Sequence, residues 1–405
     1  MTFSLAEGLA AEGCDALLVL AGSSRDPDLA PFVGPVHLGS SFVIAPRAGE
    51  PALGYLTPME RDEAAATGCR LLSPEELGVD ELLREHRAED ELWAELLARG
   101  LAVCGLEPGR LALTGRVAAG VVVGACAELG ERGWEFVDGR RLALLQRKCK
   151  GAEEQAAARH AAEGTCAAFR RVAAMLAAAR IDGETLELEG GPLTVGRLRA
   201  AIARELAGFG LEQPEGNIVA GGAAGGVPHS VGNDGDLVGP GEMLVVDLFP
   251  RGRLFADCTR TFCVGEPSPA AAEAHALVLE ALTAAHKALV PGVRGWDLQE
   301  KVCSIFEKAG HPTPRSHPGT QEGYVHGLGH GVGYEIHEYP SFRRRATEEG
   351  VIEAGDLVTL EPGLYYPGGS DGGFGVRLED LLLVTDNGPL CLTPLPYEPD
   401  PLAWA

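Results

Sequence analysis

The chain has 405 residues, of which 45% are hydrophobic, and a formal net charge of -24 at pH 7. This length is too great for one ordinary hydrophobic core, so we expect two domains. The negative charge is not offset by any local block of Lys or Arg, which excludes nucleic acid as an expected partner because its phosphates would be repelled.

The start of the chain and its cysteines are typical of a protein from the reducing cytoplasm. The first residues, MTFSLAEGLAAEGCD, lack the basic end and apolar run of a secretion signal. The apolar run VAAGVVVGACA is well short of the roughly 18 residues that a membrane-spanning helix needs. Ten cysteines without a CxxC spacing indicate free thiols. We therefore expect a cytoplasmic protein with no membrane partner.

Residues 1–148 alternate short apolar strands with acidic or Ala-rich helical stretches, as in DALLVL, SFVIAP and ELLREHRAEDELWAELLARG. This alternation predicts an α/β domain with a mixed sheet. A long Ala-rich run with helical spacing, GAEEQAAARHAAEGTCAAFRRVAAMLAAAR, then marks the start of a region with a different pattern. We place a second domain over residues 149–405.

The second domain contains the same order of elements twice. The first copy has helices near 152–180 and 193–208, followed by the strands GEMLVVDLF and LFADCTRTFCV. The second copy has helices near 269–289 and 296–309, followed by the strands GDLVTLEP and FGVRLEDLLLV. Such a repeat predicts two halves related by a pseudo-twofold axis, which brings equivalent side chains to one centre.

Acidic residues occupy matching places in the two copies. Asp247 and Glu361 each lie six residues after a glycine, and the strand that follows each carries a second acid, Asp257 or Glu379. A hairpin centred on Gly252 would set Asp247 directly opposite Asp257. A single Asp near a hairpin is usually a turn or solvated residue. Four acids in apolar β-runs would be costly to bury unless paired or bound to metal, so together they predict a metal site.

Histidines precede each pair of acids. His229 lies in GVPHSVGND, and His326, His330 and His337 lie in HGLGHGVGYEIHE. His326 and His330 share one face of an extended segment, whereas His337 needs a bend at residues 331–333 to reach the same side. His326 is compatible both with a site residue and with a satisfied strand histidine. Four carboxylates and one imidazole suit Mn²⁺, Co²⁺, Fe²⁺ or Zn²⁺ in a centre of two metal ions.

The motifs VVDLF, ADCTRTF, HGLGHGVGYEIHE, LEPGLYY and VRLEDLLLV, in this order over residues 151–390, resemble the pita-bread metallopeptidases. That family includes prolidase, aminopeptidase P and methionine aminopeptidase. The resemblance implies an α/β (α+β) chain whose C-terminal pita-bread domain has an internal pseudo-twofold repeat. Residues 1–148 are similar to the smaller creatinase-type N-terminal domain, which methionine aminopeptidases lack. The chain is therefore most similar to the Xaa-Pro peptidases.

The resemblance also implies a ligand set. Asp247 resembles the terminal ligand of one metal ion, and His330 and Glu361 resemble those of the other. Asp257 and Glu379 resemble the carboxylates that bridge both ions. The spacing of ten residues between Asp247 and Asp257 is one shorter than is usual in the family.

Further residues resemble groups that act around the metals. His229 and His337 resemble the histidines that face the substrate and move protons. His326 matches a further substrate-site histidine of the Pro-specific members. Arg377 resembles the arginine that pairs with a metal-bridging acid. Glu361 would also relay a proton to the leaving nitrogen.

These roles imply a binuclear metal-dependent exopeptidase that cleaves short peptides before a proline in second position, as a Xaa-Pro dipeptidase or a Xaa-Pro aminopeptidase. The implied metal is Mn²⁺, with Co²⁺, Zn²⁺ or Fe²⁺ as the other options, and the implied assembly is a homodimer. Two alternatives are a metal-free amidinohydrolase like creatinase and a non-catalytic pita-bread interaction module. Both branches have lost metal ligands, and this chain keeps the set.

Overall fold

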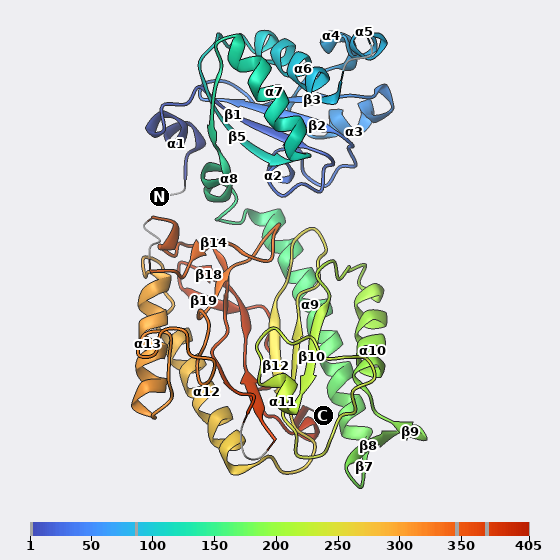
Figure 1. Cartoon of the computed structure of the whole chain (residues 1–405), viewed down its shortest axis with the longest axis vertical. Helices are drawn as coiled ribbons and strands as arrows, with labels where there is room; N and C mark the ends of the chain where they lie inside the picture. The colour runs from blue at the N-terminus through green and yellow to red at the C-terminus, as the bar shows by residue number, and fades with distance from the viewer. Residues whose placement is uncertain (1–2, 86–87, 345–347, 369–371, 405) are drawn as a thin grey trace. The chain divides into compact units, whose positions relative to one another are not determined.

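The computed structural model describes residues 3–85, 88–344, 348–368 and 372–404. The chain divides into two compact units, Met1–Arg147 and Lys148–Ala405. The division falls one residue before the boundary expected from the sequence. Figure 1 labels the helices and strands of each unit.

The N-terminal unit is built on a six-stranded mixed sheet. In sheet order its strands are β4 (Arg70–Leu72), β3 (Ala52–Tyr55), β2 (Ser41–Pro46), β1 (Ala16–Ala21), β5 (Arg110–Arg116) and β6 (Glu135–Asp138). Strand β1 pairs antiparallel with β2 and parallel with β5. The mixed sheet predicted for this region is therefore confirmed.

Apolar side chains cover both faces of this sheet. Successive residues of a strand point to opposite faces, and in β1 Leu18 packs in a cluster with Trp93 while Leu17 packs in another with Leu142. The helices of the unit are α1 (Leu5–Ala11), α2 (Ala30–Val33), η1 (Pro58–Glu60), α3 (Arg61–Ala66), α4 (Pro74–Leu77), α5 (Val79–Arg84), α6 (Glu89–Val103), α7 (Ala119–Glu131) and α8 (Arg140–Gln146). Residues 86 and 87 of the predicted acidic helical stretch lie outside the described residues.

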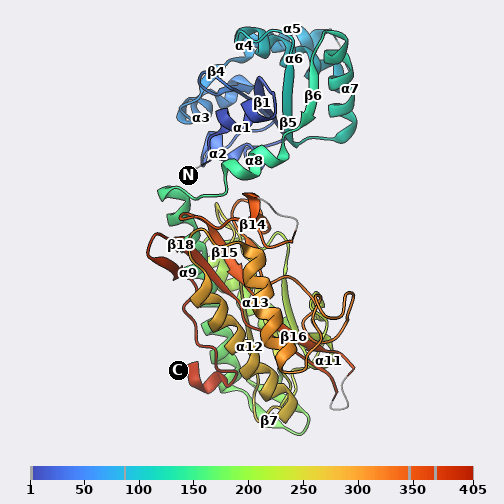
Figure 2. The same ribbon diagram turned by 90° about the vertical axis from the view of Figure 1, so that its left-hand side faces the viewer.

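The C-terminal unit contains the two predicted copies. Its helices are α9 (Ala152–Ala178), α10 (Val195–Gly208), α11 (Gly222–Gly225), α12 (Pro269–Ala288), α13 (Gly295–Lys308), η2 (Glu348–Gly350) and η3 (Pro401–Trp404). In Figure 1, α9 and α10 lie beside the strands of the first copy. Helices α12 and α13 lie beside the strands of the second copy, as Figure 2 also shows. Within the described ranges, none of the helices combines the length and apolarity needed to cross a membrane.

Two larger sheets carry the repeated strands. The first sheet has the order β10 (Asn217–Gly221), β11 (Leu244–Leu248) and β12 (Cys258–Phe262). The second has the order β14 (Glu338–Ser341), β13 (His330–Gly331), β15 (Leu357–Leu360), β18 (Asp380–Thr385) and β19 (Gly388–Cys391). Smaller sheets are formed by β16 (Gly363–Tyr366) with β17 (Phe374–Arg377), and by β7 (Arg180–Asp182), β8 (Thr185–Leu188) and β9 (Gly191–Pro192). The strand predicted over FGVRLEDLLLV is thus interrupted at residues 378–379.

The core of the second half lies between its helices and its sheet. Val278 of α12 and Phe306 of α13 pack in one buried cluster with Val358 of β15 and Leu382 of β18. Burying a large apolar side chain of this kind contributes roughly 1.5–3 kcal/mol. This packing holds β15 and β18 in place, and with them the ends of the two strands.

The hairpin that carries Asp247 has a different register from the one expected. Asp247 pairs with Thr259, so the hairpin is centred on Arg253 and not on Gly252. The prediction that Asp247 faces Asp257 directly is wrong. Asp257 instead lies one residue before β12 begins.

Contacts inside the loop keep this register up to its tip. Arg251 pairs with Phe255, and the N–H of Ala256 donates to the carbonyl of Pro250 at 3.0 Å, so the pairing stays centred on Arg253. The backbone N–H groups of Arg251 and Glu212 each donate to the other's carbonyl, at 2.8 and 2.9 Å, which attaches the loop to a segment outside the hairpin.

The corresponding strands of the second half keep the direct opposition. Leu360 at the end of β15 pairs with Asp380 at the start of β18. Glu361 and Glu379 are the next residues outward on the two strands, so their backbones leave the ladder at the same place. The two halves therefore differ, because Asp247 lies opposite Thr259, two residues beyond Asp257.

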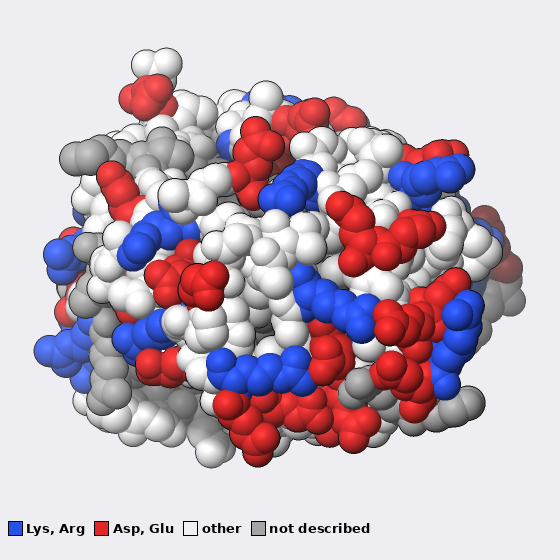
Figure 3. All heavy atoms as spheres, turned by 90° about the horizontal axis from the view of Figure 1, so that it is seen from above, with Lys and Arg blue, Asp and Glu red and all other residues white. Residues whose placement is uncertain are grey.

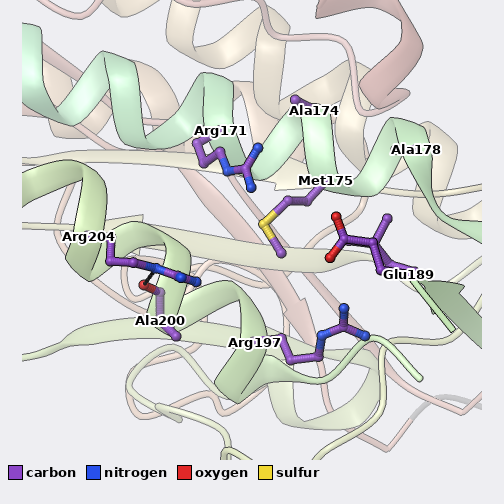
Figure 4. A pocket seen from close by; sticks show the side chains of 9 residues that line it. Arg171, Ala174, Met175, Ala178, Glu189, Arg197, Ala200 and Arg204 are labelled. Carbon is purple, nitrogen blue, oxygen red and sulfur yellow. Dashed lines mark hydrogen bonds between the residues drawn. The ribbon is translucent and has the colours of Figure 1, made fainter. Parts of the chain in front are cut away.

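A surface hollow of about 210 Å³ lies between α9, α10 and β8. Figure 4 shows the side chains of Arg171, Glu189 and Arg197 around it. Arg197 donates to the carbonyls of Gly191 and Pro192, both at 3.0 Å. The Arg197 side chain therefore ties the small sheet β7–β8–β9 to α10.

The surface carries charges of both signs. On the face in Figure 3, Asp and Glu side chains gather in groups with Lys and Arg side chains among them. Partly exposed ion pairs of the chain include Arg132 with Glu95 and Arg315 with Glu307, each at 2.6 Å. Pairs of this kind contribute at most about 1 kcal/mol each, so they add little to the stability of the fold.

A buried ion pair holds β12 to β18. The Arg260 Nη2 atom is 2.7 Å from the Asp380 Oδ1 atom, and both side chains are almost fully buried. Arg260 also donates to the carbonyl of Glu379 at 2.6 Å. Burial raises the pKa of Asp380, but the charges of Arg260 and His286 outweigh this and lower it to about 2.

We expect Arg260→Met to destabilise the protein strongly. Removing the cation leaves Asp380 as an uncompensated buried charge, which costs about 3–5 kcal/mol in comparable cases. Urea denaturation at neutral pH should show this loss in the free energy of unfolding. Because the pKa of Asp380 is lowered, its contribution should fade as the pH falls from about 4 toward 2. A loss below about 1 kcal/mol would contradict this role for the pair.

Candidate metal centre

Acidic side chains and a histidine from both halves converge at the ends of their strands. Ligand atoms of Asp257, His330 and Glu379 lie within 4.8 Å of one another. The His330 Nε2 atom is 3.5 Å from the Asp257 Oδ2 atom and 3.8 Å from the Glu361 Oε1 atom. Residues more than a hundred positions apart therefore form one cluster.

Backbone hydrogen bonds place these residues. The N–H of Glu379 donates to the carbonyl of Thr259 at 3.0 Å, which joins the segment before β18 to β12. The N–H of Glu361 donates to the carbonyl of Leu328 at 2.7 Å, which joins the end of β15 to the histidine-rich segment. The acids are thus held by main-chain contacts between segments that are remote in the sequence.

Asp247 has one carboxylate oxygen that lacks a partner. Its Oδ2 atom accepts a hydrogen bond from Arg377 Nη2 at 2.7 Å. Its Oδ1 atom is buried and has no hydrogen-bond partner. A buried acceptor left unsatisfied costs about 1–3 kcal/mol. A cation bound at this oxygen would remove that cost, so Asp247 fits a metal ligand.

The protonation of His330 also fits a metal ligand. Its Nδ1 atom lies 3.1 Å from the carbonyl oxygen of Gly331, which can only accept, so Nδ1 carries the hydrogen. The lone pair of Nε2 therefore faces the acids. Burial, together with the charge of His337, lowers the pKa of His330 to about 3. The neutral imidazole is the form that binds a metal ion.

Burial and mutual repulsion raise the pKa values of three acids in the cluster. For Asp257 and Glu379 burial is the larger cause, and the neighbouring carboxylates add to it. Burial raises the pKa of Glu361 to about 8 although Arg377 opposes the shift. Carboxylates in this situation take up protons unless cations compensate them. Four acids match the charge of two divalent ions.

Arg377 connects the two halves of the cluster. It binds Asp247 directly, and its Nε atom donates to Thr259 Oγ1 at 3.1 Å. Thr259 in turn donates to Glu379 Oε2 at 2.8 Å. The arginine therefore pairs with Asp247, to which the resemblance gave a terminal place, and reaches the proposed bridging acid Glu379 only through Thr259.

Sequence reasoning missed Thr259 and Tyr365. Tyr365 is fully buried and its hydroxyl is 2.8 Å from Arg377 Nη1. Thr259 could have been noticed because it lies two residues after Asp257, on the same side of an extended chain. Nothing in the spacing of Tyr365 points to Arg377, because their contact depends on the pairing of β16 with β17.

His326 lies beside the acids with both ring nitrogens engaged. Its Nδ1 atom is 2.7 Å from the carbonyl oxygen of Gly327, and its Nε2 atom is 2.8 Å from the Tyr365 hydroxyl. The Nδ1 atom is also 4.0 Å from Glu361 Oε2. This arrangement fits a satisfied histidine next to the cluster, which was one of the two interpretations left open by the sequence.

His337 and His229 are the exposed histidines of the region. The rings of His337 and His330 meet edge to face with centroids 4.3 Å apart. The register of β13 shifts between His330 and Gly331, as the expected bend requires. Partial desolvation of the ring lowers the pKa of His337, although the residue reaches the surface, and the charge of His229 adds to this effect. Pro228, which precedes His229, accepts a hydrogen bond from Arg377 at 3.3 Å.

Comparisons with known proteins agree with this site. The sequence profile of metallopeptidase family M24 matches residues 156–386. A Xaa-Pro dipeptidase of Pyrococcus furiosus is 36% identical over 189 residues, which are 45% of this chain and 49% of that protein. The match thus spans about half the length of this relative.

Solved structures show the same fold over nearly the whole chain. The prolidase from Pyrococcus furiosus has a TM-score of 0.73 at 23% identity, with 96% of this chain and 99% of that chain covered. The X-Pro aminopeptidase from Thermotoga maritima has a TM-score of 0.71 at 22% identity, with 97% of each chain covered. The profile match covers more than half of the chain and includes all the converging acids. This chain belongs to metallopeptidase family M24, whose name implies divalent metal ions at such a site.

Proposed function

We propose that this protein is a metal-dependent exopeptidase that hydrolyses the peptide bond before proline, as a dipeptidase or an aminopeptidase. The observation that carries the proposal is the cluster of Asp257, His330 and Glu379 with Glu361 beside it, together with the buried oxygen of Asp247 that lacks a partner. The similarity to a Xaa-Pro dipeptidase supports the substrate class. The intact cluster argues against a creatinase-like enzyme and against a non-catalytic module, since both have lost ligands.

Two divalent ions fit the donors of this cluster. Asp247 would hold one ion, His330 and Glu361 would hold the other, and Asp257 and Glu379 would bridge both. When bound, such ions polarise a carbonyl and make a water acidic enough to act as a nucleophile near neutral pH. Oxygen-rich donors favour Mn²⁺, with Co²⁺, Zn²⁺ or Fe²⁺ as the other options.

The surrounding side chains have distinct tasks in this proposal. His337 and His229 are exposed beside the cluster, so they can donate hydrogen bonds to the tetrahedral species. Glu361 would carry a proton to the leaving proline nitrogen. Arg377 orients Asp247 through their 2.7 Å contact. His326, with both nitrogens engaged, would act on the substrate only after exchanging one of these partners.

The proposal also includes the kind of substrate, the assembly and the cellular location of the protein. The tertiary amide before proline has no N–H, so a peptidase that relies on that hydrogen bond loses it there. We propose that the protein acts on short peptides with proline in second position. We also propose a homodimer in the cytoplasm, as in the family that the sequence resembles.

Metal removal should abolish hydrolysis. Treatment with a chelator should stop cleavage of a Xaa-Pro dipeptide, because the acids alone supply no nucleophile, and Mn²⁺ or Co²⁺ should restore it. The measurement is the rate together with the metal content of the same sample. Full activity in a demonstrably metal-free preparation would rule out the mechanism.

Substitutions should separate ligands from substrate-facing groups. Asp257→Asn and Glu379→Gln should lose both activity and metal, because a neutral amide bridges two cations poorly. His337→Ala should keep the metal and lose about a hundredfold in rate, as when a transition-state contact is removed. Metal analysis beside kinetics checks both. If His337→Ala lost metal while His330→Ala kept it, the two histidine assignments would be exchanged.

Proline should be preferred over alanine after the scissile bond. We expect kcat/KM for a Xaa-Pro dipeptide to exceed that for the matching Xaa-Ala dipeptide by about a hundredfold, or about 2.7 kcal/mol. Both substrates should be compared at one metal concentration, and a Xaa-Pro-Yaa tripeptide would distinguish dipeptidase from aminopeptidase. Equal rates would remove the proline assignment and leave the metal site standing.

A further inference from the structure

A buried ion pair outside the metal cluster includes Glu338, the residue that directly follows His337. The Lys150 Nζ atom is 3.0 Å from the Glu338 Oε2 atom, and both side chains have 0% exposure. Lys150 lies two residues before α9, and Glu338 follows His337 directly and begins β14. A buried pair of this kind is sensitive to the loss of either partner, because the remaining charge is left uncompensated.

Glu338 closes the turn that carries His337. Its Oε1 atom accepts a hydrogen bond from the N–H of Glu335 at 2.9 Å, while its Oε2 atom faces Lys150. The N–H of Gly333 donates to the carbonyl of Glu335 at 3.0 Å. The carboxylate therefore fixes residues 333–338 from inside, and His337 is the last residue before the anchor.

The turn packs directly onto the ion pair. A Cβ atom added at Gly333 would collide with Glu338 Oε2 and come within 2.8 Å of Lys150 Nζ. The ion pair thus fills the space that a side chain at position 333 would need. The carbonyl of Gly333 also accepts from the N–H of Phe255 at 2.8 Å, which ties the turn to the hairpin loop of the first half.

Lys150 is itself firmly held. Its N–H donates to the carbonyl of Gly355 at 2.8 Å, and its carbonyl accepts from Gln155 Nε2 at 2.8 Å. Its Nζ atom also donates to the carbonyl of Lys148 at 3.1 Å. The ammonium group of Lys150 therefore has a fixed position, from which it can hold Glu338 and the turn.

We propose that Lys150 and Glu338 are positioning residues for His337. Their ion pair holds the turn so that the His337 ring stays against His330, where the centroids are 4.3 Å apart. The inference rests on the proposed function, since it assumes that His337 acts on the transition state. Neither Lys150 nor Glu338 would contact the metal ions or the substrate.

The test compares Lys150→Met and Glu338→Gln with the wild type, as full-length metal-loaded enzymes on a Xaa-Pro dipeptide. We expect kcat to fall about tenfold or more while KM and metal content change little, because a transition-state contact is misplaced and the ligands are untouched. Lys148→Met is the matched control. Lys148 is a neighbouring buried lysine that pairs with Glu353 and Asp356, and its loss should lower stability but not kcat.

Two double variants distinguish positioning from general stability. Lys150→Met with Glu338→Leu removes both charges, which often restores stability; we expect the melting temperature to recover while kcat stays low. In a His337→Ala background, Lys150→Met should lower kcat by less than about twofold, because no His337 remains to be misplaced. Recovery of kcat together with the melting temperature, or an undiminished effect without His337, would overturn the proposal.

A readout without substrate keeps this inference separate from the proposed function. Hydrogen exchange of the peptide covering residues 333–338 should become faster in Lys150→Met and stay unchanged in Lys148→Met, because the Glu335 N–H loses its fixed acceptor only in the first. Equal exchange in both variants contradicts the positioning role. Failure of the wild type to cleave Xaa-Pro would instead contradict the proposed function.

Discussion

The burial of four carboxylates at one place is the constraint on which the C-terminal unit depends. Burial raises the pKa values of Asp257 and Glu379, and the neighbouring carboxylates raise them further. Arg377 supplies one positive charge, which pairs with Asp247. The rest of the compensation has to come from cations, and the partnerless oxygen of Asp247 marks a place for one. A cluster so costly without metal is consistent with a fold built around a metal centre.

The internal repeat explains how one chain assembles this cluster, and also why the two halves are not equivalent. In the second half, Glu361 and Glu379 leave a hairpin ladder at the same step. In the first half the ladder pairs Asp247 with Thr259 instead. The Thr259 hydroxyl lies between Arg377 and Glu379. The acids of the two halves are therefore not equivalent, and Arg377 pairs directly with Asp247.

Two buried ion pairs hold segments that lead to residues of the proposed site. Arg260 pairs with Asp380 and also binds the carbonyl of Glu379. Lys150 pairs with Glu338, next to the turn that presents His337. Such pairs add little net stability compared with apolar packing, but they tolerate few geometries. Their arrangement here fits a role in fixing the places of functional side chains.

The sequence by itself was enough to predict the repeat, most of the helices and strands that build it, and the candidate acids and histidines, because periodicity and matched spacing can be read along the chain. It misjudged the hairpin at Asp247, which pairs with Thr259 and whose loop is also bonded to the remote residue Glu212. It also missed Thr259 and Tyr365. Only the tertiary structure decided these features, because each depends on which remote segments lie against one another, and the spacing of residues along one strand carries no information about its neighbours.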